Sequence, residues 1–310
     1  MNILFILFID YKMDRKKILE KVLANKESIS EASARVYTVN LLGLAKHFNW
    51  ENPDYFTTKT SDVIKYLNTL PFAKKKSMLS SLLSFVTNKK AIDVYKKNMV
   101  EVANEINSKE NKQEKTEKQE KNWESWKDIL DTYEQVKEEA LPFFKRPIWT
   151  ASQIKSMMNY VVLSLYVLIP PRRIKDFTDF KIKNIDKKSD NYYDDKKNEL
   201  VFNSYKTVKN YGEQRVECPK ELQDVLDKWI PIASSLSDYL LFNSYGDKLS
   251  QPQLTKLINA IFGKKISASM LRHIYISEVV LKNVPKNTEL DEIARDMGQS
   301  RNQQNLYKKF

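Results

Sequence analysis

The sequence predicts an α+β protein that is mainly helical and carries one small antiparallel sheet in its second half. Apolar residues recur at helical spacing over most of the chain. Between residues 180 and 217 this spacing gives way to the alternation typical of strands. A stretch without any apolar residue, 108–121, separates two such regions. Because 310 residues with 42% hydrophobic content suffice for two cores, we expect two domains.

The chain opens with an apolar run at residues 2–9, which is too short to span a bilayer and lacks the pattern of a signal peptide. Two interpretations of segment 1–13 stay open. Either the start site is placed too early and Met13 is the true beginning, or the segment is a buried N-terminal strand. The longest other apolar run has the length of a core helix, so we expect no membrane partner.

Residues 14–107 are expected to form a helical domain. Their apolar residues follow helical spacing, with a clear pattern at 75–87. Three consecutive cations, Lys74, Lys75 and Lys76, stand at the start of this helix. Cations at a helix N-terminus oppose the helix dipole, so the three lysines indicate either a phosphate contact or a solvated charge run.

Residues 108–121 consist of polar and charged side chains alone. Such a composition cannot bury enough apolar surface to fold by itself, and it predicts a solvated helical extension or a disordered linker. The apolar pattern resumes beside Trp123. We therefore divide the chain into an N-terminal segment 1–13, a helical domain 14–107, a charged linker 108–121 and a second domain 122–310.

The second domain is expected to have helices on both sides of its strands in the sequence. Thr150 is placed to cap an apolar helix that ends at Pro170. Pro171 suits the first turn of a new element, in which Asp176 lies three residues after Arg173 and can hold its guanidinium. Strand patterns cover 180–185, 200–202 and 214–217, with a turn-bearing hairpin tip at 205–212. Further helices are expected at 220–232, 251–262, 267–282 and 289–298.

The chain is basic, because 52 Lys and Arg residues against 40 Asp and Glu residues give a formal net charge of +12. This balance favours a polyanionic partner, with nucleic acid as the first candidate. An AT-rich genome would produce a similar Lys-rich and Asn-rich profile without selection for DNA binding. One cysteine and two histidines leave no pattern for a disulfide or a zinc site, so we expect no metal and no cofactor.

Arg272 lies inside an apolar helical stripe that a preceding serine can cap. A buried arginine is costly unless it meets an anion, and the planar guanidinium suits a phosphate. Tyr307 follows near the end of the chain as a possible nucleophile. Its competitor Tyr275 lies one turn after the arginine and is interpreted as a packing residue. His273 is interpreted as a hydrogen-bonding residue of the core.

In chain order, the second domain offers Arg173, then Lys206 on the hairpin, then Arg272 and Tyr307. In this order and spacing, behind a helical first domain, they resemble the tyrosine recombinases, the phage-integrase family. The resembling motifs are Pro-Pro-Arg-Arg-Ile-Lys-Asp at 170–176, Met-Leu-Arg-His at 270–273, and Met-Gly-Gln-Ser at 297–300 followed by the tyrosine. The first motif, in a Lys-rich chain, is similar to that of integrase-like proteins of large eukaryotic DNA viruses and their mobile elements.

The resemblance covers residues 14–310 and implies a helical core DNA-binding domain followed by a tyrosine-recombinase-type catalytic domain. It implies an enzyme, a site-specific recombinase or integrase, that cuts and rejoins DNA through a 3′-phosphotyrosyl intermediate without metal. Tyr307 is then the nucleophile and Lys206 the general acid. Arg173 and Arg272 then bind the non-bridging phosphate oxygens.

Two further expected catalytic residues depart from the family's usual pattern. The family usually has histidine or lysine three residues before its second arginine, where this chain has Ser269. It usually has histidine or tryptophan after the glycine of its last motif, where this chain has Gln299. Serine brings no charge to a phosphate, and glutamine cannot act as an acid. The expected consequence is a slower active site or an inactive one.

The resemblance also implies that the protein acts on double-stranded DNA as a homo-oligomer, a tetramer on two duplexes. It would work inside a cell at DNA, and a viral protein would do so in its host cell. The expected DNA contacts are Lys74, Lys75, Lys76, Arg172, Lys209 and Arg301. Two alternatives stay open: a type IB-like topoisomerase, which shares the chemistry, and a DNA-binding homologue with impaired catalysis.

Overall fold

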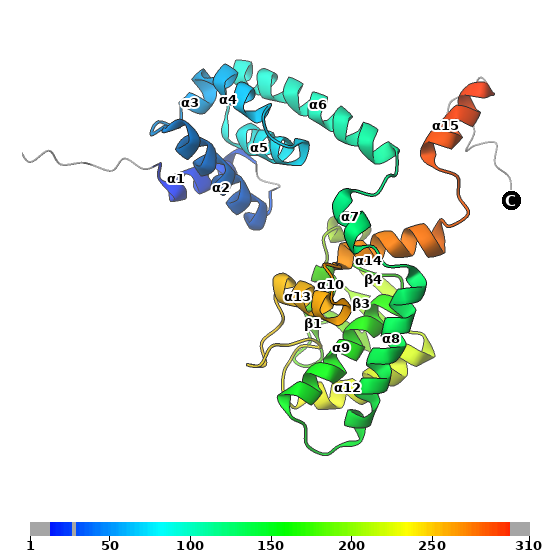
Figure 1. Ribbon diagram of the computed structural model, residues 1–310. Coiled ribbons are helices and arrows are strands. Elements are labelled where there is room, and N and C mark those ends of the chain that lie inside the picture. The colour runs from blue at the N-terminus through cyan, green and yellow to red at the C-terminus, as the bar shows by residue number, and fades with distance from the viewer. Residues whose placement is uncertain (1–12, 27–28, 298–310) are drawn as a thin grey trace, which may run out of the picture. The chain divides into compact units, whose positions relative to one another are not determined.

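The computed structural model describes residues 13–26 and 29–297, and it is mainly helical with one four-stranded sheet (Figure 1). The predicted α+β class is confirmed. The chain forms two compact units, each with its own hydrophobic core. Unit 1 comprises the described residues up to Glu114 together with those from Pro285 on, and unit 2 is Lys115–Val284.

The predicted polar linker is partly helical, because α6 (Lys89–Asn111) continues beyond residue 107. Just past its end, Gln113 accepts a hydrogen bond at 2.6 Å from the backbone N–H of Asn287, where α15 (Asn287–Asp296) begins. This contact attaches α15 to unit 1, whereas the sequence placed that segment in the second domain.

The helices that pack their apolar faces together in unit 1 are α1 (Arg15–Asn25), α2 (Glu31–Phe48), α3 (Tyr55–Thr58), α4 (Thr60–Leu67), α5 (Phe72–Phe85) and α6. Helix α15 also belongs to this unit. Helix α5 is central, because α1, α2 and α6 all pack against it. Its residues Leu79 and Leu82 are wholly buried. The side chain of Asp14 caps α1 and that of Ser30 caps α2, each accepting backbone N–H bonds.

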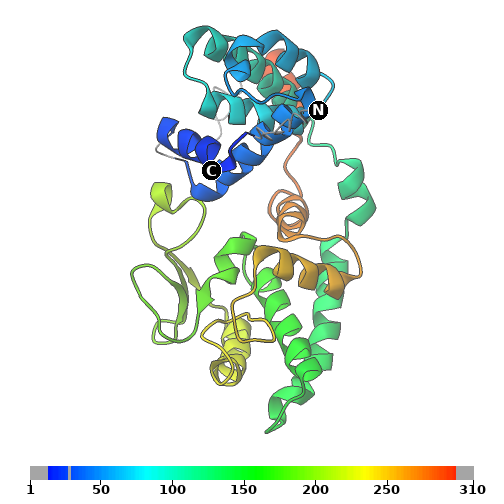
Figure 2. The ribbon, with the colours of Figure 1, turned by 90° about the vertical axis from the view of Figure 1, so that its left-hand side faces the viewer.

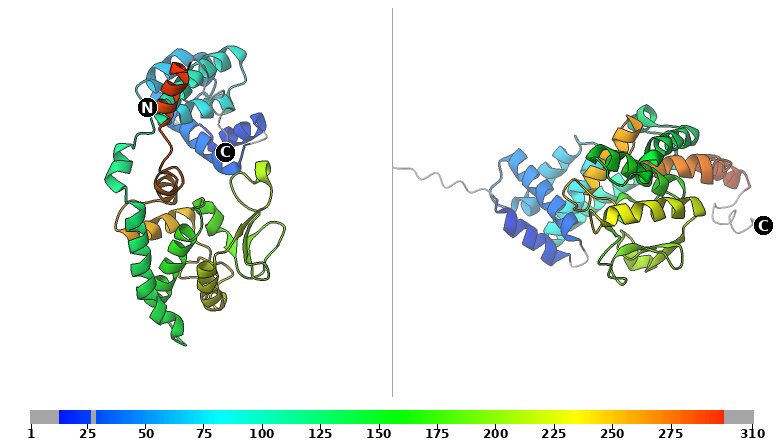
Figure 3. Two further views of the ribbon diagram at one scale, coloured as in Figure 1. Left: turned by 90° about the vertical axis from the view of Figure 1, so that its right-hand side faces the viewer. Right: turned by 90° about the horizontal axis from the view of Figure 1, so that it is seen from below.

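Unit 2 combines helices with the sheet. Its helical elements are α7 (Glu117–Asn122), α8 (Trp126–Ala140), the 3₁₀ turn η1 (Leu141–Lys145), α9 (Ala151–Val167), α10 (Ile174–Thr178), α11 (Val208–Tyr211), α12 (Lys220–Ser234), α13 (Gln251–Phe262), α14 (Ala268–Tyr275) and the π-helical turn η2 (Ile276–Val280). Helix α9 runs between α8 and the sheet (Figures 2 and 3). It begins at a capping box on Thr150, as predicted, and its residues Met157, Val161 and Leu165 are wholly buried.

The sheet has the strand order β1-β2-β3-β4. Its strands are β1 (Phe180–Lys181), β2 (Asn191–Asp194), β3 (Glu199–Phe202) and β4 (Gln214–Glu217). The pairs β2–β3 and β3–β4 are antiparallel, but β1 pairs with β2 in parallel, so the sheet is mixed rather than wholly antiparallel. The strand expected at 180–185 is shorter than predicted, since β1 ends at Lys181. The next N–H group, that of Ile182, donates instead to the Asp238 carbonyl at 2.9 Å.

The last part of unit 2 also differs in detail from the sequence pattern. Ser267 caps the helix expected at 267–282, but α14 ends at Tyr275 and the π-helical turn η2 follows. The hairpin tip expected at 205–212 contains the short helix α11. Within residues 13–26 and 29–297, no helix combines the length and the apolar character needed to cross a membrane.

Candidate functional site

The motif at 170–176, which we call the first-arginine motif, lies in the connection from α9 to α10. Its ion pair with Asp176 is formed by Arg172. The Arg172 Nε donates to Oδ2 of Asp176 at 2.9 Å, and the Asp176 side chain is almost wholly buried. This corrects the expectation that Arg173 pairs with Asp176. The three-residue spacing assumed a helical backbone, but Arg173 stands at the helix N-cap with an extended backbone (φ −70°, ψ 149°).

Three further residues contact Arg172. Its Nη2 donates to Gln214 Oε1 of β4 at 2.9 Å. Its guanidinium carbon lies 3.8 Å from the ring centroid of Phe202 and 5.6 Å from that of Tyr205. Arg172 therefore ties α10 to the sheet and to the loop after β3. Its Nε and Nη2 are engaged by the protein itself, so we expect Arg173 to be the arginine of this motif that is more open to other contacts.

The positive charges of both arginine motifs act on Asp176. Burial raises the pKa of the Asp176 carboxyl, and the positive charges of Arg172, Arg173 and Arg272 oppose this rise. Burial likewise raises the pKa of Tyr166, with the Asp176 charge adding to the rise and the Arg272 charge opposing it. Arg173 and Arg272, each half-buried, therefore lie in one neighbourhood although they are far apart in the sequence.

Charge and hydrogen bonding are incompletely balanced in this neighbourhood. Three guanidinium groups act on one carboxylate, so the local excess of charge is positive. As far as the described residues extend, Asp176 Oδ1 and the Tyr166 hydroxyl are buried and have no hydrogen-bond partner. Buried polar atoms without partners are rare in folded proteins, because each costs about 1–3 kcal/mol. An excess of positive charge beside them favours an incoming anion.

A buried asparagine, Asn191, connects the arginine turn to the lysine-bearing loop. Its Nδ2 donates to the carbonyls of Asp176 and Ser204, both at 2.9 Å. Its Oδ1 accepts from the backbone N–H groups of Asn203 at 2.8 Å and Ser204 at 2.7 Å. The residue is wholly buried and its amide makes four hydrogen bonds. Sequence reasoning missed it, since it is one asparagine among many and its partners are distant in the chain.

Lys206 lies two residues after Ser204, which Asn191 holds in place. Its neighbour Tyr205 is buried and its hydroxyl donates to the Gly212 carbonyl at 2.7 Å, which closes the loop on itself. Lys206 itself is exposed, and so is Lys209 in α11. The loop that carries the predicted general acid is therefore anchored at its base, while the ammonium remains accessible to solvent.

Helix α14 has one side buried in the core of unit 2 and another side exposed to solvent. Leu271 and Ile274 are wholly buried, Arg272 is half-buried, and Ser269 is exposed. His273 is also exposed, which corrects its interpretation as a residue of the core. An exposed position follows from the helical period, since His273 lies about 100° around the helix from Ile274 and about 160° from Leu271.

The end of α14 is fixed by Glu278 in η2. Its Oε1 accepts from the indole Nε1 of Trp123 at 2.8 Å, and its Oε2 accepts from the Trp126 backbone N–H at 2.7 Å. Tyr275 packs against Trp126 with ring centroids 5.1 Å apart, in agreement with its interpretation as a packing residue. The chain therefore leaves the second-arginine helix along a defined path.

The other predicted site residues fall into two groups. Tyr307, Gln299 and Arg301 lie outside the described residues. In unit 1, Lys74 is exposed and donates to Asn40 Oδ1 at 3.1 Å, and Lys76 is exposed as well.

Lys75 differs from its two neighbours in unit 1, because it is buried and its Nζ donates to Asn68 Oδ1 at 2.6 Å. Its ammonium is thus engaged inside the protein, which argues against the expected DNA contact at this lysine. In the described part of the chain, no cluster of three or more His, Cys, Asp or Glu side chains forms a metal site.

No family model matches the chain, and no curated protein matches it in sequence. Among solved structures, the chain is similar to the crystal structure of XerA recombinase, with 13% sequence identity and a TM-score of 0.31. The alignment covers 96% of this chain and 94% of that chain. Identity this low and a TM-score this small do not identify a family for the chain.

The different environments of Arg172 and Arg173 predict different effects of their removal. Arg172→Ala leaves the buried Asp176 carboxylate without its partner and should lower the free energy of unfolding by about 3–5 kcal/mol. Arg173→Ala breaks no such pair and should cost less than about 1 kcal/mol. Urea denaturation of both variants measures this, and a larger loss for Arg173→Ala would contradict the assignment.

The Asn191 amide offers a second test of the site's framework. Asn191→Ala removes four buried hydrogen bonds and should cost about 2–4 kcal/mol in the free energy of unfolding. Asn210→Ala, at an exposed position of α11, is the matched control and should change it by less than about 0.5 kcal/mol. Limited proteolysis should also cut the loop after β3 faster in the Asn191 variant. Equal stability of the two variants would show that the amide does not hold the loop.

Proposed function

We propose that the protein is a DNA strand-transfer enzyme of the tyrosine-recombinase type. The observation that supports this most is that the charges of Arg173 and Arg272, with that of Arg172, all act on the buried Asp176 carboxyl. Guanidinium groups near one another repel each other, and a bound anion offsets this repulsion. A phosphodiester is such an anion, and its two non-bridging oxygens suit two planar donors.

The proposed reaction is a transesterification. The Tyr307 oxygen attacks the phosphorus, loses its proton to water, and forms a new P–O bond to the phosphate on the 3′ side of the cut. The bond from phosphorus to the 5′ oxygen breaks, and that oxygen takes a proton from Lys206. Arg173 and Arg272 bind the non-bridging oxygens as charge develops, a contribution of about 3 kcal/mol each. Attack of a 5′ hydroxyl on the phosphotyrosyl bond reverses these steps and rejoins the strand.

The partner in this proposal is double-stranded DNA. The net charge of +12 and the exposed cations Lys74, Lys76 and Lys209 suit its phosphates. By its resemblance to the recombinases, the protein would integrate or recombine DNA as a tetramer on two duplexes, inside the cell and at its DNA. A viral or mobile-element origin follows from the same resemblance.

One observation favours a second candidate, a DNA-binding homologue with impaired catalysis. Ser269 is exposed at the position where the family usually has a cation, so this chain lacks one charge on the phosphate. Gln299 likewise lacks the usual acid or ring donor of the last motif. A type IB-like topoisomerase uses the same chemistry without bringing two duplexes together.

Trapping of a covalent DNA adduct tests the proposal. Nicked duplexes of randomised sequence, from which the short cleaved fragment diffuses away, should yield a protein–DNA adduct that survives denaturation. Tyr307→Phe should abolish the adduct, because it removes the nucleophilic oxygen and little else. Tyr275→Phe, at a packing position, is the matched control and should keep it.

Each other outcome of this assay has a definite meaning. Bound DNA without any adduct from the wild-type protein would favour the impaired homologue. An adduct that persists in Tyr307→Phe would exclude Tyr307 as nucleophile. Relaxation of supercoiled plasmid without recombinant products would favour the topoisomerase.

A further inference from the structure

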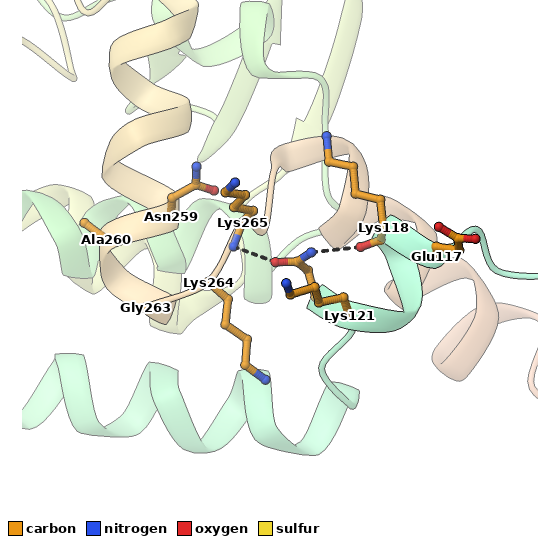
Figure 4. Close-up of a pocket in the computed structure, with 9 residues that line it drawn as sticks. Glu117, Lys118, Lys121, Asn259, Ala260, Gly263, Lys264 and Lys265 are labelled. Carbon is orange, nitrogen blue, oxygen red and sulfur yellow. Dashed lines mark hydrogen bonds between the residues drawn. The ribbon is translucent and has the colours of Figure 1, made fainter. Parts of the chain in front are cut away.

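Lysines gather around a cavity between α7 and the turn that joins α13 to α14 (Figure 4). The cavity has a volume of about 1040 Å³. We call its four lysines, Lys118, Lys121, Lys264 and Lys265, the lysine cradle. Glu117 is the acidic residue among those that line the cavity. The lining therefore carries an excess of positive charge.

Most of this positive charge is not neutralised by the protein. Lys264 forms an ion pair with Glu124. For the part of the chain that the structure describes, no ion pair joins Lys118, Lys121 or Lys265 to a carboxylate. Like charges brought together at one cavity repel each other, and this cost is recovered when a polyanion binds. A ligand with several negative charges fits this arrangement best.

The cradle is also held together before any ligand arrives. Asn122 is buried, and its Nδ2 donates to the Lys118 carbonyl at 2.9 Å. Its Oδ1 accepts from the Lys265 backbone N–H at 3.0 Å. This one amide therefore bridges the two segments that carry the lysines. Figure 4 labels Lys118 and Lys265 on these segments. Because the spacing of α7 and the α13–α14 turn is fixed in advance, less ordering cost remains for binding.

The cradle continues toward the second-arginine helix. A neighbouring cavity of about 360 Å³ shares Lys118, Asn259 and Lys265 with it and reaches Ser269 and His273 on α14. Ser269 lies three residues before Arg272 on this helix and His273 lies directly after it. Cations near a proposed phosphate-binding arginine suit the neighbouring phosphates of a nucleic-acid strand.

We infer that the lysine cradle binds backbone phosphates of duplex DNA beside the phosphate held by Arg173 and Arg272. The position relative to the cut rests on the proposed function, whereas DNA binding by the cradle does not. These contacts carry no base specificity, because phosphates are the same at every step. They fix the register of the strand on unit 2.

Equilibrium binding to a duplex of mixed sequence, measured by fluorescence anisotropy over a range of salt concentrations, tests the inference. Lys118→Ala combined with Lys265→Ala should weaken binding about tenfold and reduce the salt slope by about 0.9 for each lysine lost. The matched control is Lys220→Ala combined with Lys228→Ala on α12, which lies at the other end of unit 2 from α7 (Figure 1). The control removes the same charge and should leave the slope unchanged.

Two single variants separate a built site from a general effect of charge. Glu117→Gln removes the negative charge at the cavity and should tighten binding about twofold to threefold. Asn122→Ala changes no charge but loosens the cradle, and it should weaken binding in protein that circular dichroism shows to be folded. Equal losses of DNA affinity in the double lysine variant of the cradle and in the double lysine control on α12 would overturn the inference.

The assay involves no chemistry, so the two proposals can fail separately. If the lysine cradle binds DNA but the protein yields no covalent adduct, the inference stands and the proposed strand-transfer function is overturned. If the Lys118→Ala and Lys265→Ala double variant binds DNA with wild-type affinity and still forms the adduct, the inference is overturned and the proposed function stands.

Discussion

The buried carboxylate of Asp176 is the constraint on which the candidate site depends. A buried charge is tolerated only when it is paired, and the pairing fixes Arg172 against the sheet. Asn191 holds the same turn by its backbone and joins it to the base of the Lys206 loop. The charges of Arg173 and Arg272, from two motifs, act on this carboxylate as well. In the proposed function, an anion from outside is the partner of these two arginines.

A second support comes from the segment 122–126, which lies between α7 and α8. It accepts the Lys265 N–H through Asn122, pairs with Lys264 through Glu124, and bonds Glu278 through two tryptophans. One short segment thus fixes both ends of the second-arginine region: the turn before α14 and the π-helical turn after it. The lysine cradle and the direction in which the chain leaves α14 depend on the same contacts.

The sequence predicted what local signals determine. The helix after Thr150 and the helix α13 at 251–262 have clear caps and apolar periods, and both formed as expected. The parallel β1–β2 pair, the early end of α14, and the pairing of Arg172 rather than Arg173 depend on residues far apart in the chain. Among the site residues, the phosphate contacts expected of Arg173 and Arg272 from the motifs stay a prediction. Burial of Lys75 and the role of Asn191 had no signal, because lysine and asparagine are common throughout this sequence.

The most direct test of the central claim is single-turnover cleavage of a nicked duplex by Arg173→Ala, Arg272→Ala and the double variant at saturating DNA. If both guanidiniums bind one phosphate, each single change should slow cleavage by about 100-fold or more, and the double variant should be little slower than either. Losses that multiply in the double variant would show that the two arginines act on separate groups. That result would contradict the account of a shared phosphate site.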